Sequence, residues 1–311
     1  MAAELPRVLL VFLDGVGIGP ADPDTNPFLR TELPTLRSLL GGRFPTLDHS
    51  ETAHGDAVAF PLDALLGVQG LPQSGTGQTA LLTGENAPAL FGRHFGPWVP
   101  VALRPLLRER NLLTRALSSG VSCTFANAYP TDFSTSRWAR RPAGPPLAAE
   151  AAGLLNRHEE ALALGQALAS EIVNDGWRTH LGLAHLPLVS PQEAGANLAR
   201  LAGGARLTFF AHYTTDYVGH CGNMEDAVQA LERVDAFLDG LTAALPPRTL
   251  LVVASDHGNI EDLTGGHTLN PTLCLLAGPG AVQHRKGMAS ISDIPELVLE
   301  YLRDGSASGT P

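Results

Sequence analysis

Acidic and imidazole side chains come shortly after three separate apolar stretches of this chain. The stretches are residues 8–13, 207–212 and 250–254, and the side chains are Asp14, Asp216, His220, Asp256 and His257. If the stretches are parallel strands, their carboxyl ends meet at one edge of a sheet, where the active sites of open α/β sheets form. A single aspartate in such a place is usually a turn residue or a helix cap, but three such places in one chain favour a shared site.

The spacing of these side chains is typical of metal ligands. Asp216 and His220 are four residues apart, so a helical turn places both on one face, where they can bind one ion. Asp256 and His257 are adjacent, so they can bind two neighbouring ions or one ion at the end of a strand. His267 follows a glycine-rich turn that could bring a further imidazole to the ions. Carboxylate and imidazole ligands without a thiolate fit zinc, manganese or magnesium and do not distinguish between them.

A hydroxyl nucleophile is expected in the glycine-rich segment 71–80. Ser74 and Thr76 both precede a predicted helix, and Gly75 and Gly77 allow a tight turn and a close backbone approach. A helix N-terminus favours an anion, and metal coordination would lower the pKa of the hydroxyl further. The residues alone leave Ser74 and Thr76 as rival nucleophiles.

A charge count favours two divalent ions over one. Asp14, Asp216 and Asp256 carry three negative charges, and two divalent ions bring four positive charges. A Ser74 alkoxide would then bring the ligand set close to neutrality and leave coordination positions for phosphate oxygens. With a single ion, three carboxylates would repel a phosphate dianion. The cofactors we expect are therefore two divalent metal ions, manganese or zinc, with magnesium as a further candidate.

Strand and helix patterns alternate along the chain and predict an α/β fold with a mainly parallel central sheet flanked by helices. Near-continuous apolar stretches predict parallel strands, covered on both faces, at residues 8–13, 121–126, 207–212, 250–254 and 272–277. Helical periodicity predicts helices at residues 108–118, 223–241 and 292–302, with Asn223 and Ser292 as N-caps. The alternation breaks at residues 135–191, which we expect to form a small inserted cap on a core made of residues 1–134 and 192–311.

Composition and charge argue against several other classes. The net charge of −10 disfavours a general nucleic-acid surface, which needs a basic patch. The three cysteines show no C-x-x-C spacing, so neither a disulfide framework nor a zinc finger is indicated. The first residues carry no basic region followed by an apolar run, and no apolar stretch reaches the length of a membrane span. We therefore expect a cytoplasmic location and no nucleic-acid or membrane partner, with the oligomeric state unassigned.

Four motifs occur in a fixed order along the chain. They are Leu13-Asp14-Gly15, Gln73-Ser74-Gly75-Thr76-Gly77, Asp216-Tyr217-Val218-Gly219-His220 and Asp256-His257-Gly258-Asn259, followed by Gly266-His267-Thr268. In this order they resemble the alkaline phosphatase superfamily, and most of all the metalloenzyme core shared by cofactor-independent phosphoglycerate mutase and phosphopentomutase. The resemblance covers residues 5–133 and 200–302 and implies an alkaline phosphatase-like core.

The resemblance also implies roles for individual residues. It implies two metal sites, one formed by Asp216, His220 and His267 and the other by Asp14, Asp256, His257 and the Ser74 oxygen. Ser74 stands where the family has the serine or threonine that becomes phosphorylated, which favours Ser74 over Thr76. The mutases carry a histidine soon after this nucleophile, and Gln78 stands there in this chain.

The function that we expect is phosphoryl transfer on a small phosphorylated metabolite. The related mutases have a much larger inserted domain than residues 135–191 provide, and a mutase must keep its intermediate from water, so the reduced cap favours hydrolysis. The leading hypothesis is a phosphomonoester hydrolase that acts through a phosphoserine at Ser74. The alternatives are a phosphomutase of the phosphoglycerate or phosphopentose type and a catalytically silent metal-binding protein. A sulfatase or phosphodiesterase is also compatible with this core, although a serine at position 74 disfavours a sulfatase.

Six residues are candidates for substrate contacts: Asn26, Thr76, Arg93, Arg137, Arg140 and Arg141. Arginines can bind a phosphate or a carboxylate through paired N–H groups. A solvated surface is an equally good interpretation of the three arginines in the cap. Asn26 and Arg93 are candidates because they follow the first strand and the predicted nucleophile helix.

Overall fold

The structure is a computed structural model that describes residues 5–307, without the side chains of residues 137, 138 and 304–307. Within these residues the chain forms a seven-stranded sheet with the order β2-β3-β7-β6-β1-β5-β4. The strands are β1 (Arg7–Leu13), β2 (Thr52–His54), β3 (Ala57–Leu62), β4 (Cys123–Phe125), β5 (Leu207–His212), β6 (Thr249–Ala254) and β7 (Thr272–Ala277). The four strands β6, β1, β5 and β4 are parallel, which confirms the predicted α/β class.

The other three strands depart from the sequence prediction. β7 pairs antiparallel with both β6 and β3, so the expectation of a parallel strand at residues 272–277 is wrong. A strand that is buried on both faces has the same apolar pattern in either direction, which is why its direction could not be read from the sequence. β3 and β2 were not predicted, because β3 contains Pro61 and β2 has three residues.

The antiparallel strands determine which segments meet at the active edge of the sheet. β7 runs against β6, so it begins at the edge where β1, β5 and β6 end. β3 runs against β7 and therefore also ends at that edge. The segment before β7 carries His267 and the segment after β3 carries Ser74, so both join the three aspartate-bearing loops.

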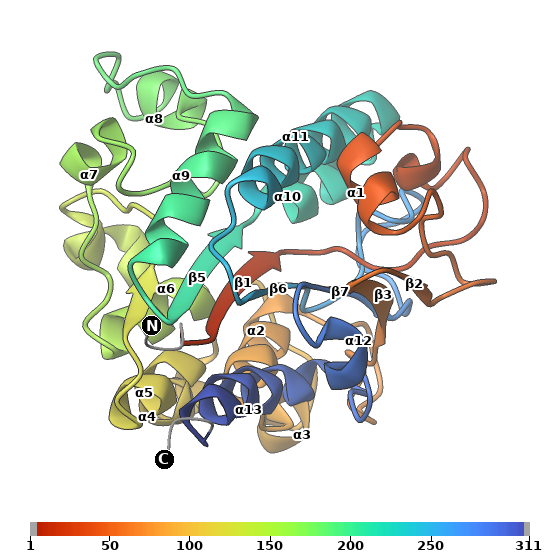
Figure 1. Cartoon of the computed structure of the whole chain (residues 1–311), viewed down its shortest axis with the longest axis horizontal. Coiled ribbons are helices and arrows are strands. Elements are labelled where there is room, and N and C mark those ends of the chain that lie inside the picture. The colour runs from red at the N-terminus through yellow and green to blue at the C-terminus, as the bar shows by residue number, and fades with distance from the viewer. Residues whose placement is uncertain (1–4, 308–311) are drawn as a thin grey trace.

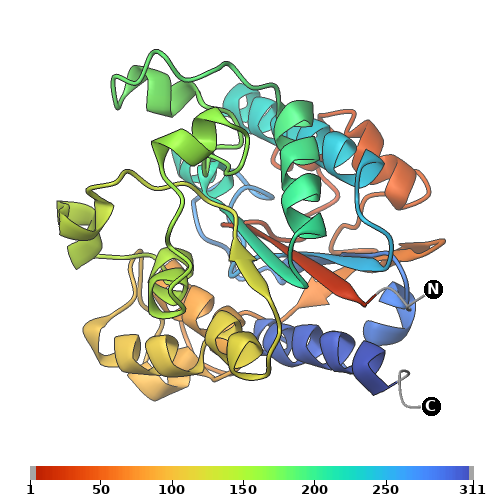
Figure 2. The ribbon, with the colours of Figure 1, turned by 60° about the vertical axis from the view of Figure 1, so that its left-hand side comes forward.

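Helices cover both faces of the sheet, as Figures 1 and 2 show. Alternate residues of β1 point to opposite faces: Val8, Leu10 and Phe12 belong to one buried cluster, and Leu9, Val11 and Leu13 belong to the other. On one face lie α1 (Pro34–Leu39), α9 (Pro191–Gly203) and α11 (Met224–Ala243). On the other face lie α2 (Ser74–Thr83), α4 (Arg104–Arg110), α5 (Leu112–Ser118), α6 (Gly144–Ala151) and α13 (Ile294–Ala307). The remaining α-helices are α3 (Ala87–Phe91), α7 (Glu159–Ala163), α8 (Asp175–Thr179), α10 (Thr214–Cys221) and α12 (Ala281–His284).

Helix ends agree with the sequence prediction in one place and differ in two. The side chain of Asn223 accepts hydrogen bonds from the first turn of α11, which confirms it as the N-cap. The predicted helix at residues 108–118 is two helices, because Asn111 ends α4 and its side chain caps α5. The prediction of Ser292 as a cap is wrong, because Ser290 forms the capping box with Asp293 at the short 3-10 turn before α13.

The segment predicted to be an inserted cap contains α6, α7 and α8. Leu147 and Ala148 of α6 are part of the main buried cluster around α2, whereas Leu162, Trp177 and Leu186 form a small separate cluster. The division into core and cap remains a prediction, and the packing of α6 ties the beginning of this segment to the nucleophile helix. No helix in the described range 5–307 combines the length and apolarity that a membrane span needs.

Candidate metal centre and nucleophile

The ends of β1 and β6 bring Asp14, Asp256 and His257 together. Their ligand atoms lie close enough to hold one cation. The Nε2 atom of His257 is 3.4 Å from Oδ1 of Asp14 and 3.6 Å from Oδ2 of Asp256. All three side chains are buried, so this group is a cluster of titratable side chains inside the fold.

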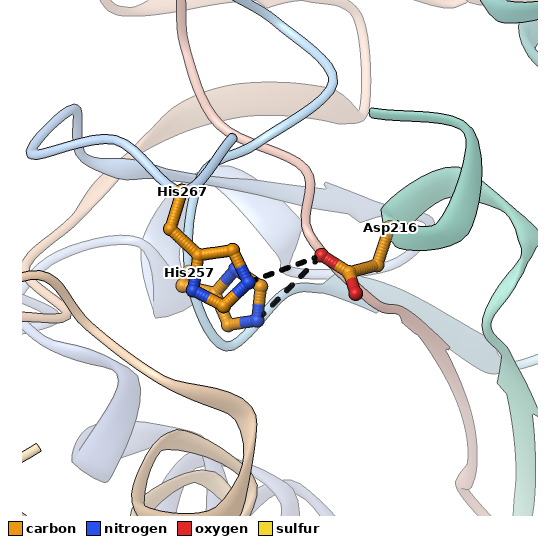
Figure 3. A group of neighbouring side chains, drawn as sticks. All are labelled: Asp216, His257 and His267. Atoms are coloured by element: carbon orange, nitrogen blue, oxygen red, sulfur yellow. Dashed lines mark ion pairs between the residues drawn. The ribbon is translucent and has the colours of Figure 1, made fainter. Parts of the chain in front are cut away.

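A second group shares His257 and adds Asp216 and His267. Figure 3 shows the carboxylate of Asp216 facing both imidazoles, with Oδ1 3.4 Å from Nε2 of His267 and 4.0 Å from Nε2 of His257. The two rings stack with centroids 3.8 Å apart. The Nδ1 atom of His267 lies 2.8 Å from the carbonyl oxygen of Pro72, a hydrogen bond that directs Nε2 toward Asp216.

His220 lies at the rim of the second group. It is one turn after Asp216 on α10, and its Nε2 is 3.5 Å from Oδ2 of Asp216 and 3.1 Å from Nε2 of His267. Its side chain is half exposed, whereas that of His267 is almost fully buried. The structure therefore brings together all six predicted ligand side chains, and it places His257 between the two groups.

Ser74 lies against the same cluster. It is the first residue of α2, is 3% exposed, and has its hydroxyl oxygen 3.0 Å from Nε2 of His257. The helix approaches the strand end closely, since a methyl group at position 77 would lie 2.8 Å from the carbonyl oxygen of Asp256. A helix N-terminus facing a hydroxyl favours negative charge at that oxygen.

The hydroxyl of Thr76, the rival nucleophile, is engaged elsewhere. It donates to the carbonyl oxygens of Gln73 and Phe95 and accepts a hydrogen bond from the backbone N–H of Phe95. Thr76 is fully buried, and these contacts tie the nucleophile turn to the loop that follows α3. The structure therefore places Thr76 as an internal support of this turn and not beside the ligand cluster.

Gln78 connects the cluster to α6. Its Nε2 donates to Oδ2 of Asp14 over 3.1 Å, and its Oε1 accepts from the backbone N–H of Gly144 over 2.8 Å. This leaves Oδ1 of Asp14 as the oxygen that faces His257. A neutral amide thus orients Asp14, a predicted metal ligand. The mutases that the sequence resembles have a histidine soon after the nucleophile, where this chain has Gln78.

Burial and the neighbouring charges shift the pKa values in the cluster in different directions. Burial raises the pKa of the Asp14 carboxyl well above its usual range, and the nearby charge of Asp256 adds to this. Burial also raises the pKa of Asp256. Burial alone would lower the pKa of His257, but the charge of Asp256 and the contact with the Asp14 carboxylate raise it to about 10. For Asp216, burial is outweighed by the hydrogen bond with His267 and the charge of His257, which lower its pKa to about 2.

The donor atoms fit a divalent cation. Oδ1 of Asp14 and Oδ2 of Asp256 are buried and have no hydrogen-bond partner among the described residues. Buried carboxylate oxygens without a partner are costly unless a cation or a proton compensates them. Carboxylates and imidazoles are ligands for zinc and manganese, and binding an ion would displace the proton from His257.

Asn259 was not singled out as a site residue by the sequence analysis, although it lies within one of the motifs. Its side-chain amide donates to Oδ1 of Asp216 over 2.7 Å and to the backbone carbonyl of the same residue over 3.1 Å. It thereby fixes the carboxylate that faces both imidazoles.

Glu261 is the second residue that the sequence analysis missed. It is fully buried, and its carboxylate accepts four hydrogen bonds, two on each oxygen. Oε2 accepts from the backbone N–H groups of Gly17 and Asn259, and Oε1 accepts from the side chains of Thr268 and Asn270. The donors come from the loops that carry Asp14, His257 and His267. The available signal was a carboxylate three positions after the Asp-His-Gly motif, in a segment that is otherwise buried.

The structure places the predicted substrate contacts in different surroundings, some buried and some exposed. Asn26 is buried and its side chain caps a 3-10 turn, so it lies in the scaffold. Arg93 and Arg140 are exposed, and neither belongs to the ligand cluster. Arg141 lines a cavity together with Tyr213, the residue that precedes α10. The side chain of Arg137 lies outside the described part of the structure.

Comparisons with known proteins show what the chain is similar to in sequence and in fold. Residues 196–303 match the Metalloenzyme superfamily. The match and the fold together confirm the resemblance to metalloenzymes of the alkaline phosphatase superfamily. Over 123 residues the chain is 34% identical to the 2,3-bisphosphoglycerate-independent phosphoglycerate mutase of Ruegeria pomeroyi, a stretch that covers 36% of this chain and 24% of that mutase. The chain thus matches about a quarter of the length of this relative.

Two solved structures show the same fold over almost the whole chain. The alkaline phosphatase of the Antarctic bacterium TAB5 has a TM-score of 0.50 at 13% identity, with 96% of this chain and 99% of that chain covered. A cold-active alkaline phosphatase from Shewanella sp. has a TM-score of 0.53 at 12% identity, with 94% and 99% covered. At these identities the likeness concerns the fold alone.

Proposed function

We propose that this chain is a metal-dependent phosphomonoester hydrolase in which Ser74 attacks the phosphorus. The observation that carries the proposal is the Ser74 hydroxyl at 3.0 Å from Nε2 of His257, inside a cluster of three carboxylates and three imidazoles. Carboxylates and imidazoles beside a hydroxyl can bind cations that activate its oxygen as a nucleophile. A serine whose role is only to begin a helix does not require carboxylates and imidazoles beside its hydroxyl.

The proposed metal sites follow the two groups of side chains. Asp14, Asp256, His257 and Ser74 would hold one divalent ion, and Asp216, His220 and His267 would hold a second. When bound, such ions supply a lowered pKa for the hydroxyl and positive charge for the phosphate oxygens. Asn259 and Gln78 would keep Asp216 and Asp14 in the orientation that leaves their free oxygens available.

The proposed reaction has two steps. Oγ of Ser74 forms a bond to phosphorus, the bond from phosphorus to the alcohol oxygen breaks, and the alcohol leaves with the proton that the serine has lost. Water then attacks the phosphoserine, which releases inorganic phosphate and restores the serine hydroxyl. The N-terminus of α2 favours the negative charge on Oγ when the hydroxyl loses its proton and again when the P–Oγ bond breaks.

A glutamine at position 78 favours the hydrolase proposal over the mutase alternative. An amide does not titrate near neutral pH, so it cannot exchange a proton with a substrate that reorients, as a histidine at this position could. In this chain the side chain is already engaged on both sides, by Asp14 and by Gly144.

A phosphomutase is the second candidate, and the curated relatives favour it more directly than hydrolysis. The matching relatives are named as phosphoglycerate mutases, although the chain matches about a quarter or less of their length. The test is to incubate the manganese-loaded or zinc-loaded protein with an aryl phosphate, a phosphoglycerate and a pentose phosphate. Release of inorganic phosphate supports the hydrolase, and isomer formation without release supports the mutase. No turnover of any ester by fully loaded protein would leave the catalytically silent alternative.

A further inference from the structure

A cavity of about 510 Å³ is lined by residues whose neighbours in the chain lead to the candidate site. We call it the Arg141 pocket; its walls include Tyr129, Phe133, Arg141, Ala143, Pro146 and Tyr213. The volume is in the range of pockets that bind ligands of drug-like size. A three-carbon phosphate would leave most of it unfilled.

The first connection between this pocket and the ligand cluster runs through Gln78. Ala143 of the pocket wall is followed by Gly144, whose backbone N–H donates to Gln78. The other end of the Gln78 amide donates to Asp14. The side chain of Gln78 therefore links the backbone next to Ala143 to Asp14, a predicted metal ligand.

The second connection runs through Trp98. The guanidinium of Arg141 lies over the Trp98 ring, 4.4 Å from its centroid. The carbonyl oxygen of Trp98 is so close to Gly75 that any side chain at position 75 would collide with it. Since Gly75 follows Ser74, Trp98 connects Arg141 to the nucleophile turn.

Tyr213 closes the pocket on a third side. It follows β5 and precedes α10, the helix that carries Asp216. Its hydroxyl lies 3.4 Å from that of Tyr129, so two hydroxyl groups form a polar spot in a wall of rings. The rings of Tyr129 and Phe133 are 4.5 Å apart.

Arg141, an exposed residue, is the charged residue of this wall. Among the described residues no carboxylate pairs with it, in a protein of net charge −10. Stacking on Trp98 holds the guanidinium by its face and leaves its N–H edge free, which is the edge that binds carboxylates and phosphates in pairs. An aromatic wall with a free guanidinium is complementary to a flat, anionic ligand.

We propose that the Arg141 pocket binds the organic part of the phosphorylated substrate, and that this part is a flat ring with a negatively charged substituent. The inference rests on the proposed phosphoryl transfer at Ser74, and it adds the class of the alcohol that leaves. The ring packs against the wall that Phe133 and the tyrosines form, and Arg141 binds the substituent.

Calorimetric titration with phosphonates tests the pocket separately from hydrolysis, because the C–P bond cannot be cleaved as an ester. The manganese-loaded protein is titrated with propylphosphonate, phenylphosphonate and 4-carboxyphenylphosphonate. We expect phenylphosphonate to bind about three- to tenfold more tightly than propylphosphonate, from the ring contacts. We expect the carboxylate to add about a further 10- to 100-fold, from the charge-assisted hydrogen bonds.

Two variants and one control assign these differences to residues. Arg141→Gln should reduce the preference for the carboxylate to less than about threefold, and Phe133→Ala should reduce the preference for the ring. Arg43→Gln, at an exposed position in the loop after α1, should leave both ratios as in the wild type. Equal affinities in the wild type, or a carboxylate preference that persists in Arg141→Gln, would overturn the proposal. If the ratios are as expected but no ester is hydrolysed or isomerised, the proposed function fails and the pocket assignment stands.

Discussion

The hydroxyl oxygen of Ser74 lies 3.0 Å from the Nε2 atom of His257, although 183 positions separate the two residues in the chain. The contact joins the segment after β3 to the segment after β6. It is the point at which the candidate nucleophile meets the candidate metal centre.

Replacing Ser74 by alanine should remove turnover while the protein stays folded. Without Oγ there is no atom to accept the phosphoryl group, so we expect phosphate release to fall by at least about a thousandfold. The metal content measured by elemental analysis should remain close to that of the wild type, because the carboxylates and imidazoles are intact. Ser74→Thr keeps a hydroxyl and should retain measurable release. Full activity in Ser74→Ala would reject the nucleophile assignment.

Replacing His267 by alanine should reduce the number of tightly bound ions by about one per chain. His267 faces Asp216 with its Nε2, and the other group, around Asp14 and Asp256, does not depend on it. Elemental analysis after removal of free metal gives the stoichiometry. His284→Ala, on α12 and outside the cluster, is the matched control. A stoichiometry that is the same in both variants would contradict the proposed ligand role.

Replacing Glu261 by glutamine should weaken both the fold and the metal sites. The amide retains one acceptor oxygen, so two of the four donors that now reach the carboxylate lose their partner. We expect a loss of about 2–4 kcal/mol in the free energy of unfolding of the metal-free protein, measured in urea. We also expect about a tenfold lower metal affinity by calorimetry, since residues that orient ligands have effects of this size.

The matched control for this experiment is Glu232→Gln, at an exposed position on α11. It makes the same chemical change without touching the loops of the site and should alter neither quantity. Wild-type stability together with wild-type metal affinity in Glu261→Gln would show that the buried carboxylate has no positioning role.

His212 should make the stability of the protein depend on pH between about 4 and 6.5. Burial lowers its pKa to about 4, although the hydrogen bond to the carbonyl oxygen of Ser170 acts in the opposite direction. Below pH 6.5 the unfolded chain binds a proton at this histidine while the folded chain does not, so stability falls as the pH falls toward 4. At pH 5 the expected loss is ~2 kcal/mol relative to neutral pH.

The His212→Gln variant isolates this effect, because glutamine can donate to Ser170 and does not titrate. Urea unfolding of the metal-free wild type and variant at pH 7.5 and pH 5 gives the difference. The other titrating groups are common to both proteins and cancel. If the wild type and the variant lose the same free energy of unfolding between the two pH values, His212 is not the source.

Much of the candidate site could be anticipated from local features of the sequence. The four-residue spacing of Asp216 and His220 places both on one face of α10, and the aspartates at strand ends meet because parallel strands end at one edge. Their role as metal ligands remains a prediction. The choice between Ser74 and Thr76 could not be made from the residues, because what distinguishes them is a contact of Thr76 with Phe95, which is distant in the chain.

The sequence by itself determined the α/β class, five of the seven strands, the long helices near residues 223–241 and 292–302, and the residues whose chemistry suits metal-assisted phosphoryl transfer, because periodicity and short spacings are local properties. Only the tertiary structure decided that β7 and β3 are antiparallel neighbours, which brings Ser74 and His267 to the edge where Asp14 and Asp256 lie. It also decided that Glu261 connects the loops around the site and that Arg141 pairs with no carboxylate in the part of the chain that the structure describes. Strand direction, buried hydrogen bonds and uncompensated charges depend on residues far away in the chain, and a local pattern is the same whichever distant partner is chosen.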